Sequence, residues 1–352
     1  MQNASQWDVY FKSLLPQFTL YCLLSRQIES LVTQKTKRIA IVTPVFNDWI
    51  SFSHLLGVIN DCAASWNAGV RVIAVDDGST ELPPSSFSEL KHIDRVEVVS
   101  LVCNLGHQQA IAVGLCEAFH QGDLEAVVVM DCDGEDPPEA IGGLLKAFHK
   151  NPNHIVVAQR GKRLETTSFR VSYLLYRALF WVLTGRIIDF GNFCLIPRAL
   201  LLRVVHLPDI WNNLAASLTK SRILLHKVRI NRGRRYAGRS KMNMVSLITH
   251  GLSAVSVYSD VVFVRVVILF TVLSMLVAVA IVVVVCLRFL TNLAIPGWTS
   301  YVTGLLSIIL LQSLLFSAGA AFLLLSRRSI LSVVPALDAR RYIRGRTVIH
   351  EL

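Results

Sequence analysis

Short apolar runs recur through the first half of the chain at intervals of about 26–32 residues. They are rich in Val and Ile, a composition typical of strands that are buried on both faces. Helix-like segments lie between them, over residues 49–66, 107–120 and 137–150. This alternation predicts an α/β fold with a mainly parallel sheet covered by helices. The predicted strands cover residues 38–46, 70–77, 96–102, 126–131 and 154–160.

Polar residues follow directly after each of these runs. Ligands of open parallel sheets bind beyond the carboxyl ends of the strands, so these residues are candidates for a site. No GxGxxG pattern follows the first run and no GxxxxGK(S/T) pattern occurs, which disfavours dinucleotide binding and P-loop chemistry. The polar clusters are Asn47-Asp48, residues 76–79, residues 104–107, residues 131–136 and Gln159-Arg160.

Two much longer apolar stretches lie near the C-terminus. Residues 266–287 form a run of 22 uncharged residues, and residues 302–325 form a second of 24. Each exceeds the roughly 20 residues that a helix needs to cross a bilayer. The chain is 53% hydrophobic and only 17% charged, which is too apolar for a wholly soluble protein of 352 residues. A hairpin of two transmembrane helices is therefore predicted over residues 266–328.

The flanks of this hairpin are basic. Arg265 precedes it, Arg327 and Arg328 follow it, and four more arginines lie in the tail. Because positively charged flanks stay on the cytoplasmic side, both chain ends and the N-terminal domain are predicted to be cytoplasmic. Residues 1–37 lack the pattern of a cleavable signal peptide. The seven cysteines lack CxxC spacing, which suits a reduced compartment without disulfides or a zinc site.

Two further segments are predicted to lie near the membrane. Residues 171–183 are apolar around Arg177 and too short to span, so an amphipathic surface helix is expected over about 168–184. The net charge is +11, and residues 220–241 contain nine Lys or Arg and no acid. Such a run is a solvated face, a contact with anionic lipid or a specific phosphate site. These alternatives stay open.

An Asp-x-Asp pattern, Asp131 and Asp133, follows the fourth run. Alternate residues of an extended segment point to the same side, so the two carboxylates can converge on one divalent cation. Oxygen ligands suit Mg²⁺ or Mn²⁺, which also take phosphate oxygens. A lone Asp-x-Asp is more often a turn or a helix cap, but its place among strand-end polar clusters favours a metal. Asp136 and Glu139 need no ligand, because a helix N-terminus attracts negative charge.

Six motifs occur in order along the chain: TPVFND (43–48), VDDGSTE (75–81), NLGHQQA (104–110), MDCDGEDPPE (130–139), RRYAGRSKMN (234–243) and PGW (296–298). Together with the hairpin, they resemble the family 2 glycosyltransferases of the polyprenyl-phosphate type, such as dolichol-phosphate mannose synthase and the bactoprenol glucosyl transferases. The resemblance covers roughly residues 37–328 and depends on the order and spacing of the motifs.

The resemblance implies a GT-A fold, a nucleotide-sugar donor, a polyprenyl-phosphate acceptor and inversion at the anomeric carbon. It implies a divalent cation, Mg²⁺ or Mn²⁺, at Asp131, Asp133 and Glu135. The other donor-side residues would be Pro44, Phe46, Asp48, Asp77 and His107, although His107 could simply begin its helix. Asp133, Arg160 and Arg198 would form the catalytic group, and the acceptor phosphate would meet Arg235, Arg239, Ser240 and Lys241.

The implied reaction needs charge stabilisation more than it needs a base. A phosphate monoester has a second pKa of about 6, so it is largely dianionic at neutral pH and already nucleophilic. A cation together with Arg or Lys would stabilise the departing nucleoside diphosphate. No general base is therefore assigned.

One motif departs from the family pattern. Relatives commonly have Asp-Phe-Arg-Leu where this chain has Asn192-Phe193-Cys194-Leu195, with Arg198 retained. Without that acid and that first arginine, the loop is not expected to bind the acceptor phosphate as it does in relatives, although Asp189 or Arg198 could compensate. Cys132 and Cys194 are interpreted as small packing residues.

The predicted organisation has five parts: an N-terminal helical extension (1–36), a catalytic domain (37–240), a juxtamembrane helix (241–265), the hairpin (266–328) and a basic cytoplasmic tail (329–352). The expected location is the inner membrane of a bacterium, with a role in cell-envelope glycan biosynthesis and no nucleic-acid partner. The sugar, the nucleotide, the exact lipid and the pathway are not predicted, and a homo-oligomer is left open.

Two other functions stay open. Transfer to a hydroxyl of a glycolipid or polysaccharide would need a general base. The Gln-x-x-Arg-Trp signature of processive synthases is absent, however, and two helices are too few for an export channel. The other alternative is a catalytically lapsed membrane scaffold, which only the altered loop at Asn192 and Cys194 supports.

Overall fold

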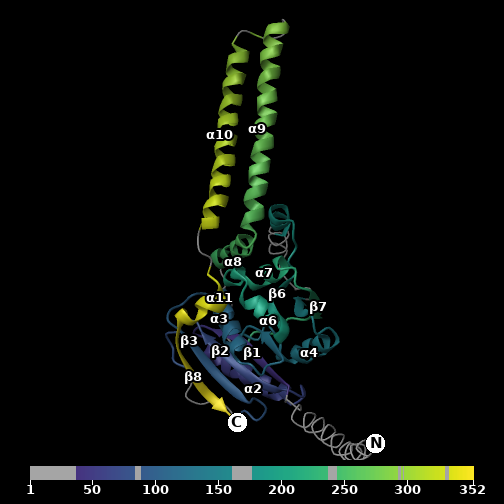
Figure 1. Ribbon diagram of the computed structural model, residues 1–352, viewed down its shortest axis with the longest axis vertical. Coiled ribbons are helices and arrows are strands. Elements are labelled where there is room, and N and C mark those ends of the chain that lie inside the picture. The colour runs from purple at the N-terminus through teal and green to yellow at the C-terminus, as the bar shows by residue number, and fades with distance from the viewer. Residues whose placement is uncertain are drawn as a thin grey trace, which may run out of the picture.

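A mixed sheet lies at the centre of the domain below a long helical hairpin (Figure 1). The computed structural model describes residues 37–83, 89–160, 177–236, 244–291, 295, 297–329 and 333–352. In these residues the sheet has eight strands in the order β7-β5-β6-β4-β1-β2-β3-β8. The strands are β1 (Arg38–Val45), β2 (Gly69–Asp76), β3 (Arg95–Leu101), β4 (Ala126–Val129), β5 (Ile155–Arg160), β6 (Phe190–Pro197), β7 (Leu225–Ile230) and β8 (Ile343–Glu351).

The five predicted strands are all present, and the prediction of a mainly parallel sheet is confirmed. β1 pairs in parallel with both β2 and β4, and β2 pairs in parallel with β3. β5 pairs in parallel with β7. Two strands that the apolar pattern did not predict are antiparallel: β6 lies between β4 and β5, and β8 lies beside β3.

Helices cover both faces of the sheet. Successive residues of a strand point to opposite faces, so Ile39 and Ile41 pack on one side of β1 while Ala40 and Val42 pack on the other. The first face meets α2 (Trp49–Ala63) and α4 (Ile141–Lys150), which a short 3₁₀ turn η1 (Pro138–Ala140) precedes. The second face meets α3 (His107–His120), α6 (Arg198–Val205), η2 (Pro208–Trp211) and α7 (Leu214–Lys220).

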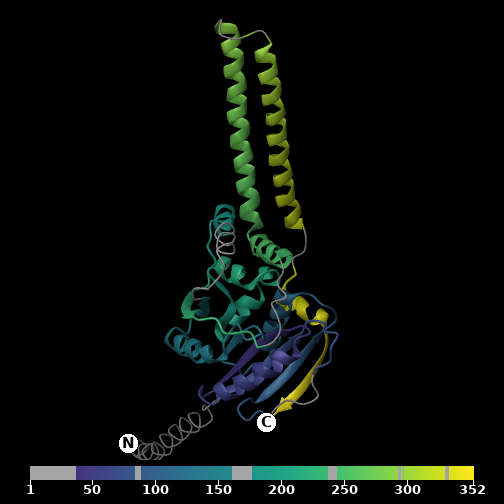
Figure 2. The ribbon, with the colours of Figure 1, turned by 180° about the vertical axis from the view of Figure 1, so that it is seen from behind.

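Two helices of the described chain are long and apolar enough to cross a membrane: α9 (Ser259–Leu290) and α10 (Trp298–Ser329). They lie side by side in both ribbon views (Figures 1 and 2). Ser274 on α9 and Ser313 on α10 share a buried hydrogen bond of 2.7 Å, whereas most of the apolar side chains face outward. An outward apolar surface on a helical hairpin suits a lipid environment. The predicted hairpin is therefore present as a candidate transmembrane hairpin.

Apolar side chains are also exposed at the base of the hairpin. Residues 177–184 are helical and lie near α8 (Met244–Ser256) and the first turns of α9. Phe180 is buried and packs edge-on against Tyr258, with ring centroids 5.9 Å apart. Leu179 and Trp181 on the same helix are more than half exposed. This is the described part of the helix that was expected to lie on the membrane surface.

The chain returns to the sheet after the hairpin. A short helix α11 (Pro335–Asp338) and the 3₁₀ turn η3 (Ala339–Tyr342) lead into β8. The Val102 amide donates to the Tyr342 carbonyl at 2.9 Å, and Arg346 forms an ion pair with Glu117 on α3. The sequence predicted only a basic tail here. Because β8 completes the same sheet as β1–β7, the segments before and after the hairpin lie on one side of it (Figure 2).

The Arg346–Glu117 pair fastens this strand to α3. Glu117 is buried, and Arg346 donates to it through Nη2 at 2.9 Å as well as through Nε. Arg346→Met would leave a buried carboxylate without its cation. The expected loss of unfolding free energy is about 1–2 kcal/mol, since the guanidinium is partly exposed.

Thermal unfolding of the purified protein in detergent measures this loss, and limited proteolysis of the C-terminus localises it. Arg344→Met is the matched control, because Arg344 is exposed on the same strand and forms no ion pair with the described residues. Equal midpoints for the two variants would show that the pair contributes nothing.

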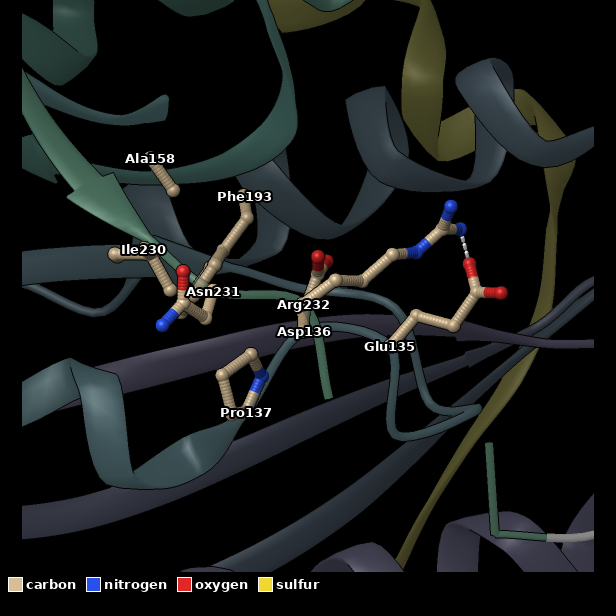
Figure 3. Close-up of a pocket in the computed structure, with 8 residues that line it drawn as sticks. All are labelled: Glu135, Asp136, Pro137, Ala158, Phe193, Ile230, Asn231 and Arg232. Atoms are coloured by element: carbon tan, nitrogen blue, oxygen red, sulfur yellow. Dashed lines mark ion pairs between the residues drawn. The ribbon is translucent and has the colours of Figure 1, made fainter. Parts of the chain in front are cut away.

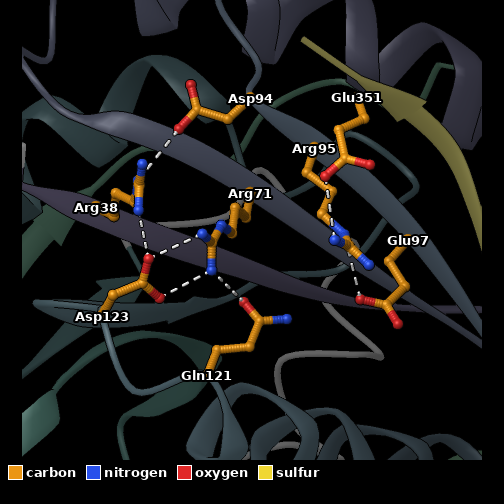
Figure 4. Close-up of polar contacts among 8 residues, drawn as sticks. All are labelled: Arg38, Arg71, Asp94, Arg95, Glu97, Gln121, Asp123 and Glu351. Carbon is orange, nitrogen blue, oxygen red and sulfur yellow. Dashed lines mark hydrogen bonds and ion pairs between the residues drawn. The ribbon is translucent and has the colours of Figure 1, made fainter.

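Ion pairs tie together the amino-terminal ends of the parallel strands (Figure 4). Asp123 accepts hydrogen bonds from Arg71 at 2.8 and 2.9 Å and from Arg38 at 2.5 Å. Burial alone would raise the pKa of Asp123, but the two guanidinium groups lower it below its usual value. Arg95 bridges to Glu351 of β8 at 3.2 Å. This charged edge stabilises the sheet and lies opposite the carboxyl ends of its parallel strands.

Candidate active site

The loops after β1 and β2 are joined by hydrogen bonds at the carboxyl edge of the sheet. The Asn47 side-chain oxygen accepts from the amides of Thr80 at 2.9 Å and Glu81 at 3.3 Å. The Asn47 amide donates to Ser79 Oγ at 2.9 Å. Asn47 has φ +48°, a left-handed conformation that Asn tolerates better than most residues. The two loops therefore form one preorganised surface beside the strand ends.

Asp77 fastens a third loop to this surface. Its buried carboxylate accepts from the Leu105 amide at 2.7 Å and from the Gly106 amide at 3.0 Å. Burial raises the pKa of Asp77 above its usual value, although the two amides act in the opposite direction. The resemblance implied that Asp77 holds the nucleoside. In this structure its contacts position the loop that leads into His107.

Asp77→Ala is expected to release that loop. Two charge-assisted hydrogen bonds would be lost and two amides left without their acceptor, at a cost of about 2 kcal/mol. Hydrogen exchange at Leu105 and Gly106 should accelerate about 30-fold. The exposed Asp61 on α2 provides the control variant, Asp61→Ala. Unchanged protection of Leu105 and Gly106 in Asp77→Ala would contradict the assignment.

The Asp-x-Asp residues lie on a tight turn after β4. The Asp131 amide donates to Asp136 Oδ2 at 3.1 Å, and the Glu135 amide donates to Asp133 Oδ1 at 2.9 Å. Burial raises the pKa of Asp133 most, followed by the charge of Asp131, with a smaller contribution from Asp48. The turn thus brings Asp131 and Asp133 together, and Asp48 from the first loop is close enough to add to the repulsion that acts on Asp133.

A basic segment, residues 231–236, crosses the acidic turn, which is formed by residues 131–136. The Gly233 amide donates to the Glu135 carbonyl at 2.9 Å, and the Tyr236 amide donates to the Asp133 carbonyl at 2.9 Å. Arg235 Nη2 lies 2.5 Å from Asp133 Oδ2. Arg232 forms an ion pair with Glu135, as Figure 3 shows. Two arginines therefore supply positive charge to Asp133 and Glu135 in this structure.

The two segments approach so closely that glycine is required in both. A Cβ on Gly233 would collide with the Gly134 carbonyl oxygen. Gly134 has φ +88°, and a Cβ there would lie 2.8 Å from the Tyr236 ring. Arg232, Gly233 and Tyr236 were not among the predicted site residues. The sequence feature that could have revealed this segment as part of the site was the long run of basic residues without an acid.

A polar network extends from Asp131 to β6. His107 Nε2 lies 3.2 Å from Asp131 Oδ1 and 3.1 Å from the side-chain nitrogen of Asn192. Gln108 donates to Asn192 Oδ1 at 3.2 Å and accepts from the Leu214 amide at 2.8 Å. Burial lowers the pKa of His107 most, but Asp131 and the other acids of the turn outweigh it, and the pKa lies above its usual value. Asn192, which stands where relatives commonly have Asp, thus belongs to the site.

Residues 40–211 match the model of glycosyl transferase family 2. The chain contains a family 2 glycosyltransferase domain. Its sheet and helices form a GT-A-like α/β fold, as predicted. The match ends before β7, so the basic segment 231–236 and the hairpin lie outside it.

Curated relatives match a little under half of the chain. The uncharacterized glycosyltransferase YkcC of Bacillus subtilis is 31% identical over 163 residues, which are 45% of this chain and 49% of the relative. The undecaprenyl-phosphate 4-deoxy-4-formamido-L-arabinose transferase of Proteus mirabilis is 25% identical over 159 residues, 45% of this chain and 48% of that protein. The chain thus spans about half the length of these relatives.

The chain is also similar to two solved structures at low sequence identity. Mannosyl-3-phosphoglycerate synthase from Rubrobacter xylanophilus gives a TM-score of 0.47 at 17% identity, over 66% of this chain and 75% of that one. Glucosyl-3-phosphoglycerate synthase from Mycobacterium tuberculosis, solved with Mn²⁺ and uridine-diphosphate, gives 0.41 at 16% identity, over 63% and 78%.

The family 2 domain does not bring every predicted residue to this site. β6 runs antiparallel to β4 and pairs Pro197 with Ala126, so Arg198 lies at the opposite end of β4 from Asp131. Arg198 donates to the Phe119 carbonyl at 2.7 Å, and its guanidinium lies 4.7 Å from the centre of that ring. This placement contradicts the expectations that Arg198 is catalytic and that it compensates for the phosphate binding lost with the altered β6 motif.

The remaining predicted residues differ in how the structure places them. Pro44 is buried within β1, whereas Phe46 just after it is 45% exposed beside the site. Arg160 ends β5, where its backbone alone is described. Asp189 accepts from Gln159 at 2.7 Å and pairs with Lys227 at 2.8 Å. Arg239, Ser240 and Lys241 lie outside the described residues, as do residues 1–36.

A divalent cation at the acidic turn would need ligands beyond the protein. No group of three or more His, Cys, Asp or Glu in the described parts of the chain is placed to hold a metal ion. Asp131 and Asp133 nevertheless offer two carboxylates on one turn, close enough to repel each other. Mg²⁺ sites commonly use one or two protein carboxylates and take their other ligands from substrate phosphates and water. The residues therefore fit a cation shared with a diphosphate.

Proposed function

We propose that the protein is a membrane-anchored, inverting glycosyltransferase that moves a sugar from a nucleotide-sugar to a polyprenyl phosphate. The observation that carries this proposal is the meeting of the acidic turn 131–136 with the basic segment 231–236 at the carboxyl edge of a family 2 domain. Such a pairing supports a site in which the carboxylates would bind a cation and the guanidinium groups would bind phosphate. The named activity of the Proteus mirabilis relative supports the same class of acceptor.

The donor would lie across the loops that follow β1, β2 and β4. Asp131 and Asp133 would hold Mg²⁺ or Mn²⁺ with the diphosphate, and the bound cation would offset the negative charge of the departing group. The nucleoside would contact the exposed face of Phe46 and Asp48. Asp77 would not contact the donor itself but would position the loop before His107. His107 and Asn192 would border the sugar.

The acceptor phosphate would approach from the side of the hairpin. Its dianion is the nucleophile, so the proposal assigns no general base. Arg235 is the described residue best placed to bring the two anionic substrates together, and Arg239, Ser240 and Lys241 would extend the same segment. The exposed apolar residues of helix 177–184 support a membrane surface close to this side of the domain.

The proposed topology places the catalytic domain and the returning strand β8 in the cytoplasm. The basic residues around the hairpin support this orientation. The catalytic unit would comprise residues 37–240 together with β8, and residues 241–328 would anchor it.

Release of nucleoside diphosphate tests the donor half of this proposal. Purified full-length protein in detergent would be incubated with undecaprenyl phosphate, Mg²⁺ or Mn²⁺ and a panel of nucleotide-sugars. One donor should be consumed rapidly with the lipid phosphate present, and EDTA should abolish the reaction. Equal consumption with a polyprenol or glycolipid hydroxyl would favour the alternative acceptor class. No consumption of any donor would favour a lapsed scaffold.

A further inference from the structure

We propose that Arg232 and Arg235 are exchangeable counter-ions of the acidic turn. They neutralise Asp133 and Glu135 while the donor site is empty, and their guanidinium groups move to the donor diphosphate when a divalent cation takes the carboxylates. This inference rests on the proposed function, because it requires that the turn binds a cation together with a diphosphate.

A divalent cation and Arg235 would compete for the carboxylate of Asp133. Oδ1 accepts from the Glu135 amide at 2.9 Å, and Oδ2 lies 2.5 Å from Arg235 Nη2. The Asp133 side chain is only 13% exposed, so these two partners supply most of the neutralisation and hydrogen bonding that its carboxylate receives. A divalent cation at Oδ2 would meet the positive charge of Arg235 at close range, so the two compete for this oxygen. Glu135 is engaged in the same way by Arg232.

Both arginines have N–H groups that no acceptor in the described residues satisfies. Arg235 Nε, Arg232 Nε and Arg232 Nη1 are buried and have no hydrogen-bond partner among the described residues. A buried guanidinium nitrogen without an acceptor is costly, and phosphate oxygens are the acceptors that its planar fork fits best. A diphosphate at the turn would supply acceptors that the protein itself does not.

The backbone of the segment is fixed independently of these side chains. The amides of Gly233 and Tyr236 bond to the carbonyls of Glu135 and Asp133, and the Tyr236 ring lies 4.4 Å from the His54 ring. The exchange therefore requires side-chain rotation without withdrawal of the segment. Because the cation and the diphosphate each remove one partner from the ion pairs, their binding should be cooperative.

A Mn²⁺ titration followed by electron paramagnetic resonance tests the exchange on the full-length protein in detergent. Arg235→Gln should bind Mn²⁺ alone about tenfold more tightly than the wild type, because the competing cation is gone. The same variant should bind UDP or GDP at saturating Mn²⁺ at least tenfold more weakly. Opposite changes in the two affinities are the signature of exchange.

Two further variants make the result decisive. Arg234→Gln removes a charge from the same segment, but Arg234 is exposed and forms no ion pair within the described chain, so both affinities should stay within twofold. Arg235→Lys keeps the charge without the fork, and should weaken nucleotide binding while leaving Mn²⁺ binding near the wild-type value.

Weaker or unchanged Mn²⁺ binding in Arg235→Gln would overturn the exchange, even if the wild type binds nucleotide. A wild-type protein that binds no nucleoside diphosphate with any divalent metal would instead overturn the proposed function, and the exchange with it.

Discussion

Asp133→Asn should reduce sugar transfer by about a thousandfold or more. The substitution keeps the size of the side chain, and its oxygen can still accept the hydrogen bond of the Glu135 amide. It removes the charge that would bind the cation, and metal stabilisation of a leaving phosphate is worth several kcal/mol, at 1.36 kcal/mol for each tenfold in rate. The initial rate of lipid-linked product formation at saturating donor and metal measures the effect.

Glu139→Gln is the matched control, because Glu139 is exposed just beyond the same turn. It should transfer sugar at close to the wild-type rate. If Asp133→Asn retained more than a tenth of wild-type activity while Mn²⁺ binding was lost, the turn would not be the catalytic metal site.

Gly114→Val should unfold the domain or destabilise it by about 3 kcal/mol or more. Gly114 on α3 lies against β1 and β2, and a Cβ there would collide with the Val42 side chain and lie 2.9 Å from Val75 Cγ2. Both valines are fully buried and β-branched, so neither can rotate away at low cost. Because α3 also carries His107 and Gln108, the site should be displaced with the helix.

The equivalent change on α4, Gly143→Val, separates packing from helix propensity. Gly143 is exposed and a Cβ there meets nothing within 4 Å. Chemical denaturation should show a large decrease in the unfolding free energy for Gly114→Val and little change for Gly143→Val. Similar effects at both positions would mean that α3 has room to move away from the sheet.

Strands buried on both faces were predictable because their apolar runs are continuous. β8 was not, since the stretch from Ile343 to Glu351 has two arginines and no continuous apolar run, a composition that resembles a solvated tail. It becomes a strand because β3 offers a free edge and Glu117 offers a partner for Arg346. Such pairing depends on tertiary context more than on local propensity.

The candidate site was predictable as far as it follows from parallel strands. Asp48, Asp77 and Asp131 each follow a strand of the parallel core, and parallel strands end at one edge of the sheet. The prediction that Arg198 is catalytic was wrong because motif spacing does not reveal strand direction. The antiparallel β6 places Arg198 at the other edge of the sheet. The pairing of Arg235 with Asp133 joins residues about a hundred positions apart, which no local pattern could predict.

The mass spectrum of the product formed from undecaprenyl phosphate and the preferred nucleotide-sugar tests the central claim most directly. We expect a lipid whose mass rises by one sugar residue, linked through the existing phosphate, with the sugar released by mild acid as befits a glycosyl phosphodiester. The product should be absent with Asp133→Asn and present with Glu139→Gln. A sugar attached to a hydroxyl acceptor, or free sugar released by hydrolysis with the lipid phosphate unchanged, would contradict it.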